Sequence, residues 1–293
     1  MDSRSGGILS EALAAIQQAA LNWPEPVRVE RAVVGVFFTG VKLSNGHAGV
    51  CFTPLKNIPE AVCCPSSART MPASGRLRGR EAMDLAREGL DGGPLQKALA
   101  ISTLNALSSA CLASETAARR DLRIGVDPIN LLRLEPDIRV VVVGALVPYL
   151  RALKARGRPF HVLEQDPATL KADELPFFVP AERAAEVVPQ ADVLILTGTT
   201  LLTATLEGLL ALAQQDACVI VVGPTASLLL EALFRRGVSV VAGIRVTQPD
   251  VLLETLAEGG SGYHFFGQSA VKTALFNPDR RRKEGACSTL AES

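Results

Sequence analysis

The chain has 293 residues, of which 48% are hydrophobic and 20% are charged. Its 30 Lys and Arg residues balance its 30 Asp and Glu residues, so it lacks the excess positive charge with which nucleic-acid-binding proteins neutralise phosphates. This composition excludes extensive disorder and argues against a nucleic-acid partner. At about 150 residues per domain, the length predicts two domains.

The mean hydropathy of +0.24 raises the question of membrane insertion. The longest uncharged stretches of the C-terminal half, 193–206 and 217–230, contain Gly, Thr or Pro and fall short of the roughly 20 apolar residues that a spanning helix needs. The segment 9–21 carries Glu and Gln and lacks the layout of a signal peptide. Six cysteines without a C-x-x-C pair favour reduced thiols. We therefore expect a cytoplasmic protein without a membrane partner.

The first part of the chain, 1–120, is predicted to form a small α+β domain. Two strand-like runs, 31–43 and 47–52, flank Ser44-Asn45-Gly46, and Asn-Gly between such runs predicts a β-hairpin. Helices are expected over 79–89 and 94–118. A connector over 121–137, punctuated by prolines, follows.

The second part, 138–278, alternates apolar, β-branched runs with helical stretches, as repeated strand-helix units do. The strands are expected at 138–143, 159–163, 192–196, 217–222 and 238–241. The helices are expected at 148–156, 181–188 and 201–214, with a fourth capped by Thr225 or Ser227 and ending at Arg236. Strands so uniformly apolar are covered on both faces, which predicts an α/β fold with a Rossmann-like, doubly wound parallel sheet. The tail, 279–293, is expected to be disordered.

Small and hydroxylated residues stand where these strands end, and in an open parallel sheet ligands bind outside the carboxyl ends of the strands. The residues are Gly144, Glu164, Thr197, Gly198, Thr199, Thr200, Gly223, Pro224 and Thr225. Backbone N–H groups at the helix N-termini that follow would favour an anionic group. The alternative is that these residues only form turns and caps.

The first of these strand ends carries one glycine, Gly144, where a dinucleotide site would carry G-x-G-x-x-G. This argues against NAD or FAD. Glu164 follows at the end of the next strand, about 20 residues on, where an acidic residue commonly holds ribose hydroxyls. A nucleoside-like or otherwise hydroxylated ligand therefore stays open, with a solvated loop acid as the alternative.

Two further groups of polar residues deserve a functional interpretation. His47, Cys51, Cys63 and Cys64 are of metal-ligand types, but along a strand His47 and Cys51 lie about 13 Å apart, too far for one tetrahedral ion. We therefore assign no metal ligand. The basic stretch with Arg76, Arg78 and Arg80 either binds an anion or is a solvated loop.

The run from Thr197 to Glu207, followed by Gly223-Pro224-Thr225, by the segment from Leu233 to Val238 and by Ala242-Gly243, resembles the putative heavy-metal-chelation family. The hairpin from Phe38 to Ser44 and the helix residues from Leu104 to Leu107 resemble its smaller domain. The resemblance implies an enolase N-terminal-like domain, 1–120, joined to a Rossmann-like domain, with a ligand site between them. It also implies a role in handling flavin-, pterin- or siderophore-like molecules and hence in heavy-metal chelation.

Carried over by position, the resemblance points to Thr39, Lys42 and Asn105 beside the strand-end residues. The sequence departs from the family pattern at Thr203-Ala204, where members tend to carry Asn-Gly, and at Ala145-Leu146, which replaces a more polar or aromatic pair. Both departures fall at the expected pocket, so the ligand or the activity is expected to differ.

We expect the interdomain cleft to bind a small anionic or metal-chelating molecule, with Lys42 as counter-charge and Glu164 as acceptor of hydroxyl protons. A chelated heavy metal, or a nucleoside-like or pterin-like molecule, would be the bound group. One alternative is an enzyme of condensation, hydrolysis or methyl transfer that uses Lys42, Glu164 or Asp127 as acid or base. The other is a metal-delivery or scaffold protein with a vestigial cleft. The apolar content is compatible with a homodimer.

Overall fold

The computed structural model describes residues 7–57, 70–71, 73–114, 122–132, 134, 137–227 and 231–280. The chain divides into two compact units, each assembled from several segments. The first unit comprises Met1–Arg119, Pro224–Ala232 and Gly243–Lys272, and the second comprises Arg120–Gly223, Leu233–Ala242 and Thr273–Ser293. The expected tail lies outside the described residues from 281 on. No helix among the described residues is long and apolar enough to cross a membrane.

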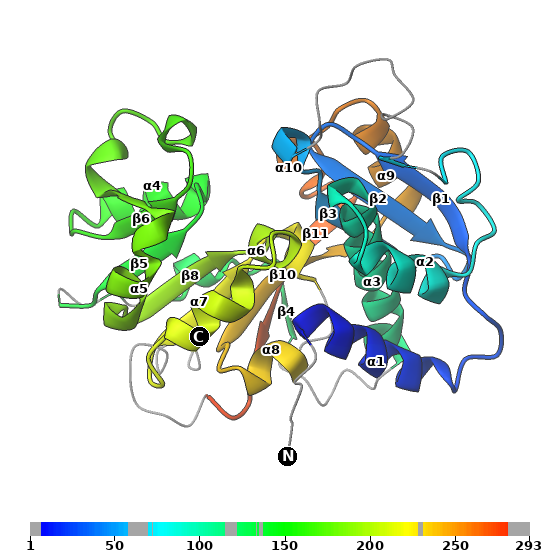
Figure 1. Ribbon diagram of the computed structural model, residues 1–293, viewed down its shortest axis with the longest axis horizontal. Helices are drawn as coiled ribbons and strands as arrows, with labels where there is room; N and C mark the ends of the chain where they lie inside the picture. The colour runs from blue at the N-terminus through cyan, green and yellow to red at the C-terminus, as the bar shows by residue number, and fades with distance from the viewer. Residues whose placement is uncertain are drawn as a thin grey trace. The chain divides into compact units, whose positions relative to one another are not determined.

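The first unit is built on an antiparallel sheet of β1 (Val29–Val34), β2 (Phe38–Leu43) and β3 (Ala48–Phe52). The long helix α3 (Pro94–Ser114) packs against β2 and β3, and α9 (Pro249–Ala257) packs against β1 and β2 (Figure 1). The remaining helices are α1 (Ile8–Ala20), α2 (Ala82–Leu90) and α10 (Gly262–Phe265). The unit is therefore α+β.

The hairpin predicted at Ser44-Asn45-Gly46 joins β2 and β3, with Gly46 at φ +82°. The single strand expected over 31–43 is wrong, because the chain reverses between β1 and β2. Gly35 makes this reversal possible, since a Cβ there would collide with the carbonyl oxygen of Leu256 in α9. Apart from Gly35 itself, the apolar residues of this run give no local turn signal, and the N–H of Gly35 donates to the carbonyl oxygen of Phe38 (3.1 Å) across the reversal.

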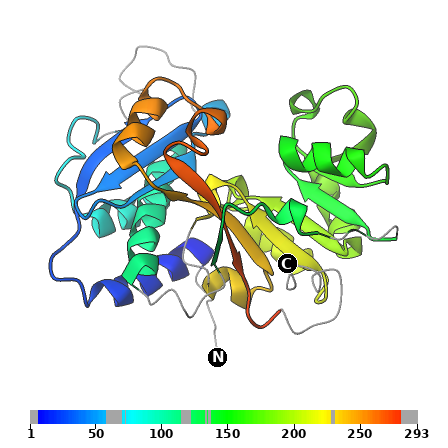
Figure 2. The same cartoon turned by 180° about the vertical axis from the view of Figure 1, so that it is seen from behind.

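The second unit contains most of an eight-stranded sheet with the order β4-β11-β10-β9-β8-β5-β6-β7 (Figure 2). The strands are β4 (Leu122–Ile124), β5 (Val140–Val143), β6 (His161–Glu164), β7 (Phe178–Pro180), β8 (Val193–Thr197), β9 (Cys218–Val222), β10 (Val240–Val246) and β11 (Ala270–Phe276). Neighbouring strands from β10 to β7 pair in parallel, whereas β11 pairs antiparallel with β4. The predicted α/β class with a mostly parallel, Rossmann-like sheet is confirmed.

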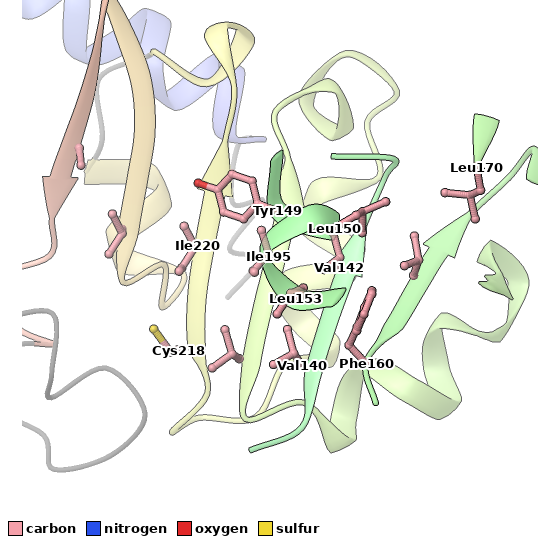
Figure 3. Close-up of a cluster of buried hydrophobic side chains, with 14 of the residues drawn as sticks. Val140, Val142, Tyr149, Leu150, Leu153, Phe160, Leu170, Ile195, Cys218 and Ile220 are labelled. Atoms are coloured by element: carbon pink, nitrogen blue, oxygen red, sulfur yellow. The ribbon is translucent and has the colours of Figure 1, made fainter. Parts of the chain in front are cut away.

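Helix α4 (Val147–Ala155) covers one face of this sheet through Tyr149, Leu150 and Leu153, which pack on Val142 and Ile195 (Figure 3). On the strands, neighbouring residues such as Val141 and Val142 are both buried. Because successive residues of a strand point to opposite faces, both faces are covered. The uniform apolar runs in the sequence reflect this two-sided burial.

In place of the helices predicted at 181–188 and 201–214, the structure has the shorter helices α5 (Ala184–Val187), α6 (Thr199–Leu202) and α7 (Leu206–Leu212), and α8 (Glu231–Arg235) lies within the helix expected to end at Arg236. The continuous helix expected over 201–214 is wrong, because Ala204 adopts φ +56° and separates α6 from α7. At the expected start of the next helix, Pro224–Ala226 forms a 3-10 turn.

The expectation of reduced thiols holds for Cys51 and Cys111, which are buried and form no disulfide. It is wrong for Cys218, which is disulfide-bonded. Sequence spacing does not reveal this bond, because only the fold determines which cysteines approach each other.

Candidate functional site

A cavity of about 530 Å³ lies at the carboxyl ends of β5, β6 and β8. The chain proceeds from β5 to β6 and β7 on one side of the sheet and from β8 to β9 and β10 on the other, so the strand order reverses between β5 and β8. Ligands of doubly wound sheets bind at this switch point. The lining residues are Val143, Gly144, Leu163, Glu164, Gln165, Ala181, Ala184, Thr197, Thr199, Thr200, Thr203, Ala204, Thr205, Gly208, Leu209 and Leu212. The volume suits a small organic molecule.

Gly144 turns the chain at the end of β5, and because it has no side chain it leaves the cavity open. Its φ is +95°, and a Cβ there would lie 2.8 Å from Cγ2 and 3.1 Å from Cβ of Thr197. Its N–H donates to the carbonyl oxygen of Leu163 (2.9 Å), which holds the turn against β6. Both the backbone conformation and the close approach require glycine here.

Glu164 at the end of β6 is held by backbone donors. Its Oε1 accepts from the N–H of Gln165 (2.7 Å) and, more weakly, of Asp166 (3.4 Å), and its Oε2 accepts from the N–H of Ala145 (3.1 Å). A carboxylate has about four acceptor sites, so Oε2 retains one for a further donor. The carboxylate is therefore oriented before a ligand arrives.

Threonine hydroxyls form the opposite wall of the cavity. The Oγ1 atoms of Thr197 and Thr199 are 3.1 Å apart, and those of Thr203 and Thr205 are 2.9 Å apart. Thr200 Oγ1 donates to the carbonyl oxygen of Thr197 (2.6 Å). Because each hydroxyl has one donor and two acceptor positions, this wall can offer hydrogen bonds of either polarity.

Ala204 shapes this wall through its backbone. It lines the cavity, and its φ of +56° is rare for a residue with a Cβ. The left-handed turn ends α6 after four residues and starts α7 two residues later. Threonines 203 and 205 on either side of it consequently both line the cavity.

Charge in this cavity is unevenly distributed. Glu164 is the one charged side chain among the described residues that line it. The other polar groups are hydroxyls and the amide of Gln165. A single carboxylate in a largely apolar cavity favours neutral or cationic hydrogen-bond donors over anions.

Two predicted glycines of the strand ends do not line this cavity. The N–H of Gly198 donates to the carbonyl oxygen of Val222 (2.6 Å), and that of Gly223 donates to the carbonyl oxygen of Ala242 (2.8 Å). These bonds continue the sheet pairing beyond β8 and β9. The expected contribution of Gly198 and Gly223 to binding stays a prediction.

Thr39, Asn105 and Thr225 belong to the first unit, as does the half-buried Pro224, and the side chains of the first three form a buried polar cluster. Asn105 Nδ2 donates to the carbonyl oxygens of Val50 (2.8 Å), Thr225 (3.1 Å) and Pro224 (3.4 Å). Its Oδ1 has no hydrogen-bond partner among the described residues.

The two threonines of this cluster are also hydrogen-bonded within the first unit. Thr225 Oγ1 accepts from the N–H of Phe52 (3.0 Å), and Thr39 Oγ1 lies 3.0 Å from Thr53 Oγ1. These contacts join β2, β3 and α3 to Pro224–Ala226, and a ligand role for this cluster stays a prediction.

Lys42, expected as a counter-charge for the ligand, is paired inside the first unit. Its Nζ donates to Glu30 Oε1 (2.8 Å) and to both carboxylate oxygens of Asp250 (2.9 Å). The hydrogen bonds to Glu30 and then to Asp250 raise the pKa of Lys42. Two carboxylates thus neutralise the cation that was expected to meet an anionic ligand.

Asp127, a candidate acid or base, holds a buried tyrosine. Its Oδ1 accepts from Tyr149 Oη (2.7 Å) and from the N–H of Ile129 (3.4 Å). Burial first, and the neighbouring Asp127 carboxylate second, raise the pKa of Tyr149. These contacts give Asp127 a structural role, and its chemical role stays a prediction.

A metal held by protein side chains does not fit the described residues. They contain no group of three His, Cys, Asp or Glu side chains that could hold an ion. Burial raises the pKa of Cys51 to about 12, so it stays a thiol near neutral pH, and metal binding requires the thiolate. His47 Nδ1 lies 3.0 Å from Ser109 Oγ. Cys63 and Cys64 lie outside the described residues.

Sequence reasoning missed several lining residues, chiefly Gln165, Thr205 and Gly208, whereas Thr203 and Ala204 line the cavity as the family resemblance led us to expect. Thr205 and Gly208 lie in the helix expected over 201–214, and in a continuous helix no local pattern marks which of its residues line a cavity. The available signal was the density of threonine between Thr197 and Thr205, since threonine is not a strong helix former.

The fold and the cavity define a Rossmann-like α/β protein with a cavity of ligand size at the switch point of its sheet. Family models described as putative heavy-metal chelation match residues 127–275 and 16–108. The chain therefore belongs to this family. The expected family resemblance is confirmed.

Individual relatives agree with this assignment. An uncharacterised protein of Methanocaldococcus jannaschii is 28% identical over 179 residues, which span 60% of this chain and 64% of that relative. The match thus covers less than two thirds of the relative's length.

Two solved structures of proteins of unknown function from the same family have the same fold. One, from Pyrococcus horikoshii, is 18% identical with a TM-score of 0.72 and covers 92% of this chain and 99% of its own. The other, from Desulfitobacterium hafniense, is 16% identical with a TM-score of 0.67 and covers 91% and 98%.

Proposed function

We propose that this protein binds a small organic molecule with hydroxyl groups, neutral or cationic and of nucleoside- or pterin-like size, in the cavity at the ends of β5, β6 and β8. A heavy metal, where one is involved, is carried by that molecule and not by protein side chains. The observation that carries the proposal is the carboxylate of Glu164, fixed by three backbone N–H groups at the wall of a cavity of about 530 Å³.

The position of Glu164 supports a ligand with hydroxyl donors. Glu164 ends the strand after Gly144, where acidic residues of Rossmann-like proteins accept hydrogen bonds from ribose hydroxyls. Its Oε2 has an acceptor site left, and the threonine wall across the cavity supplies donors and acceptors to a heterocycle. The apolar residues Leu163, Leu209 and Leu212 provide contact area for a ring system.

The charge of the lining separates this proposal from the anionic ligand expected from the sequence. That expectation relied on helix N-termini, but α6 is a single turn of four residues. It also relied on Lys42, which Glu30 and Asp250 neutralise. The family description, putative heavy-metal chelation, is compatible with a neutral chelating heterocycle.

Isothermal titration calorimetry with matched probes tests the proposal. Adenosine and biopterin are the neutral probes with hydroxyl groups, 2′,3′-dideoxyadenosine lacks the 2′- and 3′-hydroxyls of the ribose, and adenosine monophosphate adds negative charge. We expect adenosine or biopterin to bind, dideoxyadenosine to bind about tenfold more weakly than adenosine, and the monophosphate to bind more weakly than the nucleoside. Binding by neither neutral probe, or tighter binding of the monophosphate, would refute the proposal.

Two variants locate the binding. Glu164→Gln keeps the shape of the side chain but removes its charge and half of its acceptor capacity, so the discrimination between adenosine and dideoxyadenosine should vanish. Glu182→Gln is the control, because Glu182 is exposed in the same unit and does not line the cavity. If both variants bound the probes like the wild type, Glu164 would not be part of the site.

A further inference from the structure

A second cavity, of about 260 Å³, lies in the first unit between α2, α3 and the loop that precedes α2. Its polar lining is Arg76, Arg80, Glu88 and Gln96. Its apolar lining is Met71, Ala73, Leu77, Leu85 and Leu99. Two of the three arginines of the basic stretch therefore line a cavity, and the third, Arg78, is exposed elsewhere on the loop.

The loop that carries Arg80 is fixed to the sheet. The N–H of Val29 donates to the carbonyl oxygen of Arg80 (2.9 Å), and the N–H of Gly79 donates to the carbonyl oxygen of Val29 (2.8 Å). Arg28 Nη1 adds a bond to the carbonyl oxygen of Gly79 (2.9 Å). The backbone of Arg80 is therefore held in place before a ligand binds, which lowers the entropic cost of binding.

Arg80 retains donors for a ligand. Its Nη2 makes both contacts to the carboxylate of Glu88, at 2.8 and 2.7 Å. Its Nε and Nη1 donate to no side chain among the described residues. The side chain of Glu88 is 62% exposed, so this ion pair is screened by water and contributes little to stability. A ligand anion can share or replace Glu88.

The lining has the opposite charge to that of the cavity in the second unit. Among the described residues that line each cavity, two arginines and one glutamate carry a formal charge of +1 in this one, whereas Glu164 gives the other −1. Gln96 uses its Oε1 to accept from the N–H of Gly93 (2.9 Å), which leaves the donor side of its amide available. Leu85 and Leu99 are almost fully buried and form an apolar floor.

We propose that this cavity is a second ligand site, which binds a small organic monocarboxylate with an apolar body. The carboxylate is bound by Arg80, with Arg76 adding positive charge, and the apolar body contacts the leucine floor. Arginine suits carboxylates because its planar guanidinium donates two parallel hydrogen bonds. Bare phosphate would leave the apolar lining in contact with water.

The test measures binding of phenylbutyrate to the full chain by calorimetry, with phenylbutanol as the uncharged counterpart and inorganic phosphate as the anion without an apolar body. We expect phenylbutyrate to bind at least about tenfold more tightly than either. If phenylbutanol bound as tightly as phenylbutyrate, the arginines would not be needed for binding. If phosphate bound as tightly as phenylbutyrate, the apolar floor would not be needed. Either result would overturn the proposal.

Variants of the ion pair give opposite predicted effects. Arg80→Gln should weaken phenylbutyrate binding about tenfold or more, whereas Glu88→Gln should strengthen it about threefold, because the competing carboxylate is gone. Arg78→Gln is the matched control and should change the affinity less than about twofold. Unchanged affinity in Arg80→Gln, or weaker binding in Glu88→Gln, would contradict the proposal. Loss of binding in Glu164→Gln would place the probe in the other cavity and also overturn it.

Discussion

Replacing Gly144 by alanine tests how the cavity of the second unit is built. Two costs combine in the variant. A Cβ at φ +95° strains the backbone by about 1–3 kcal/mol, and its approach to 2.8 Å from Thr197 Cγ2 adds an overpacking cost of about 1–3 kcal/mol. The smaller entropy of the unfolded alanine chain offsets about 0.4–1 kcal/mol. We expect Gly144→Ala to lower the free energy of unfolding by about 2–4 kcal/mol.

Urea unfolding followed by circular dichroism measures this loss as a shift of the midpoint at unchanged slope. Thr197→Ser separates the two costs, because serine lacks the Cγ2 that a new Cβ would contact and keeps the Oγ1 that faces Thr199. In the double variant we expect a recovery of about 0.5–1 kcal/mol beyond additivity. The strain from φ should remain, since it belongs to the backbone.

Gly208→Ala is the matched control for this experiment. Gly208 also lines the cavity, but it lies in α7 and a Cβ there would have open space around it. Alanine is the better helix former, so this variant should be about 0.5–1 kcal/mol more stable than the wild type. A loss below about 1 kcal/mol in Gly144→Ala, or exact additivity with Thr197→Ser, would refute the steric reasoning.

Four further predictions use the same unfolding and binding measurements. Ala204→Gly should raise the free energy of unfolding by about 0.5 kcal/mol, because relief of the strain at φ +56° exceeds the entropic cost of glycine; a destabilised variant would contradict this. Desolvation lowers the pKa of His47 below 6.5 in the folded protein. The unfolded chain therefore binds the proton more readily, and the free energy of unfolding falls as the pH drops below 6.5. In urea titrations at acid pH, His47→Gln should make this fall in the free energy of unfolding shallower. Lys42→Met should lower the midpoint of thermal unfolding, because it leaves the carboxylates of Glu30 and Asp250 without their cation. The affinity for adenosine or biopterin should not change. The difference in midpoint from the wild type should shrink as the pH rises past 10.5, where the wild-type lysine loses its proton. Cys51 should resist alkylation at pH 8 in the folded protein and react in urea, as peptide mass spectrometry would show, because burial raises its pKa to about 12.

Local patterns predicted the strands of the Rossmann-like sheet and the residues at their ends. The apolar β-branched runs and the Gly, Glu and Thr residues that end them are adjacent in the sequence. Which strand ends meet depends on strand order, and local patterns contain no information about it. The structure places β5 between β6 and β8, so Gly144 meets Glu164 and Thr197, whereas Gly223 ends a strand beyond β8.

Two of the elements were predicted wrongly, for different reasons. The turn at Gly35 lies within an apolar run that favours a strand, yet α9 approaches closely enough to exclude any side chain there. The break at Ala204 lies within a stretch that was expected to be helical, but threonines stand on both sides of it and threonine is not a strong helix former. At Gly35 a contact with α9, distant in sequence, excludes a side chain, whereas at Ala204 the local sequence already weakens the helix.

Although the chain has a formal net charge of zero, the described residues that line its two cavities carry opposite formal charges. Composition excluded a strongly basic surface, but it could not show that Glu164 is the charged lining residue of one cavity while Arg76 and Arg80 outnumber Glu88 in the other. Electrostatic attraction is screened beyond about 8 Å at physiological salt, so we expect each cavity to select ligands by its own lining and not by the sum over the chain. The charge of a small molecule should therefore decide which unit it binds, with neutral or cationic hydroxylated molecules in the second unit and monocarboxylates in the first.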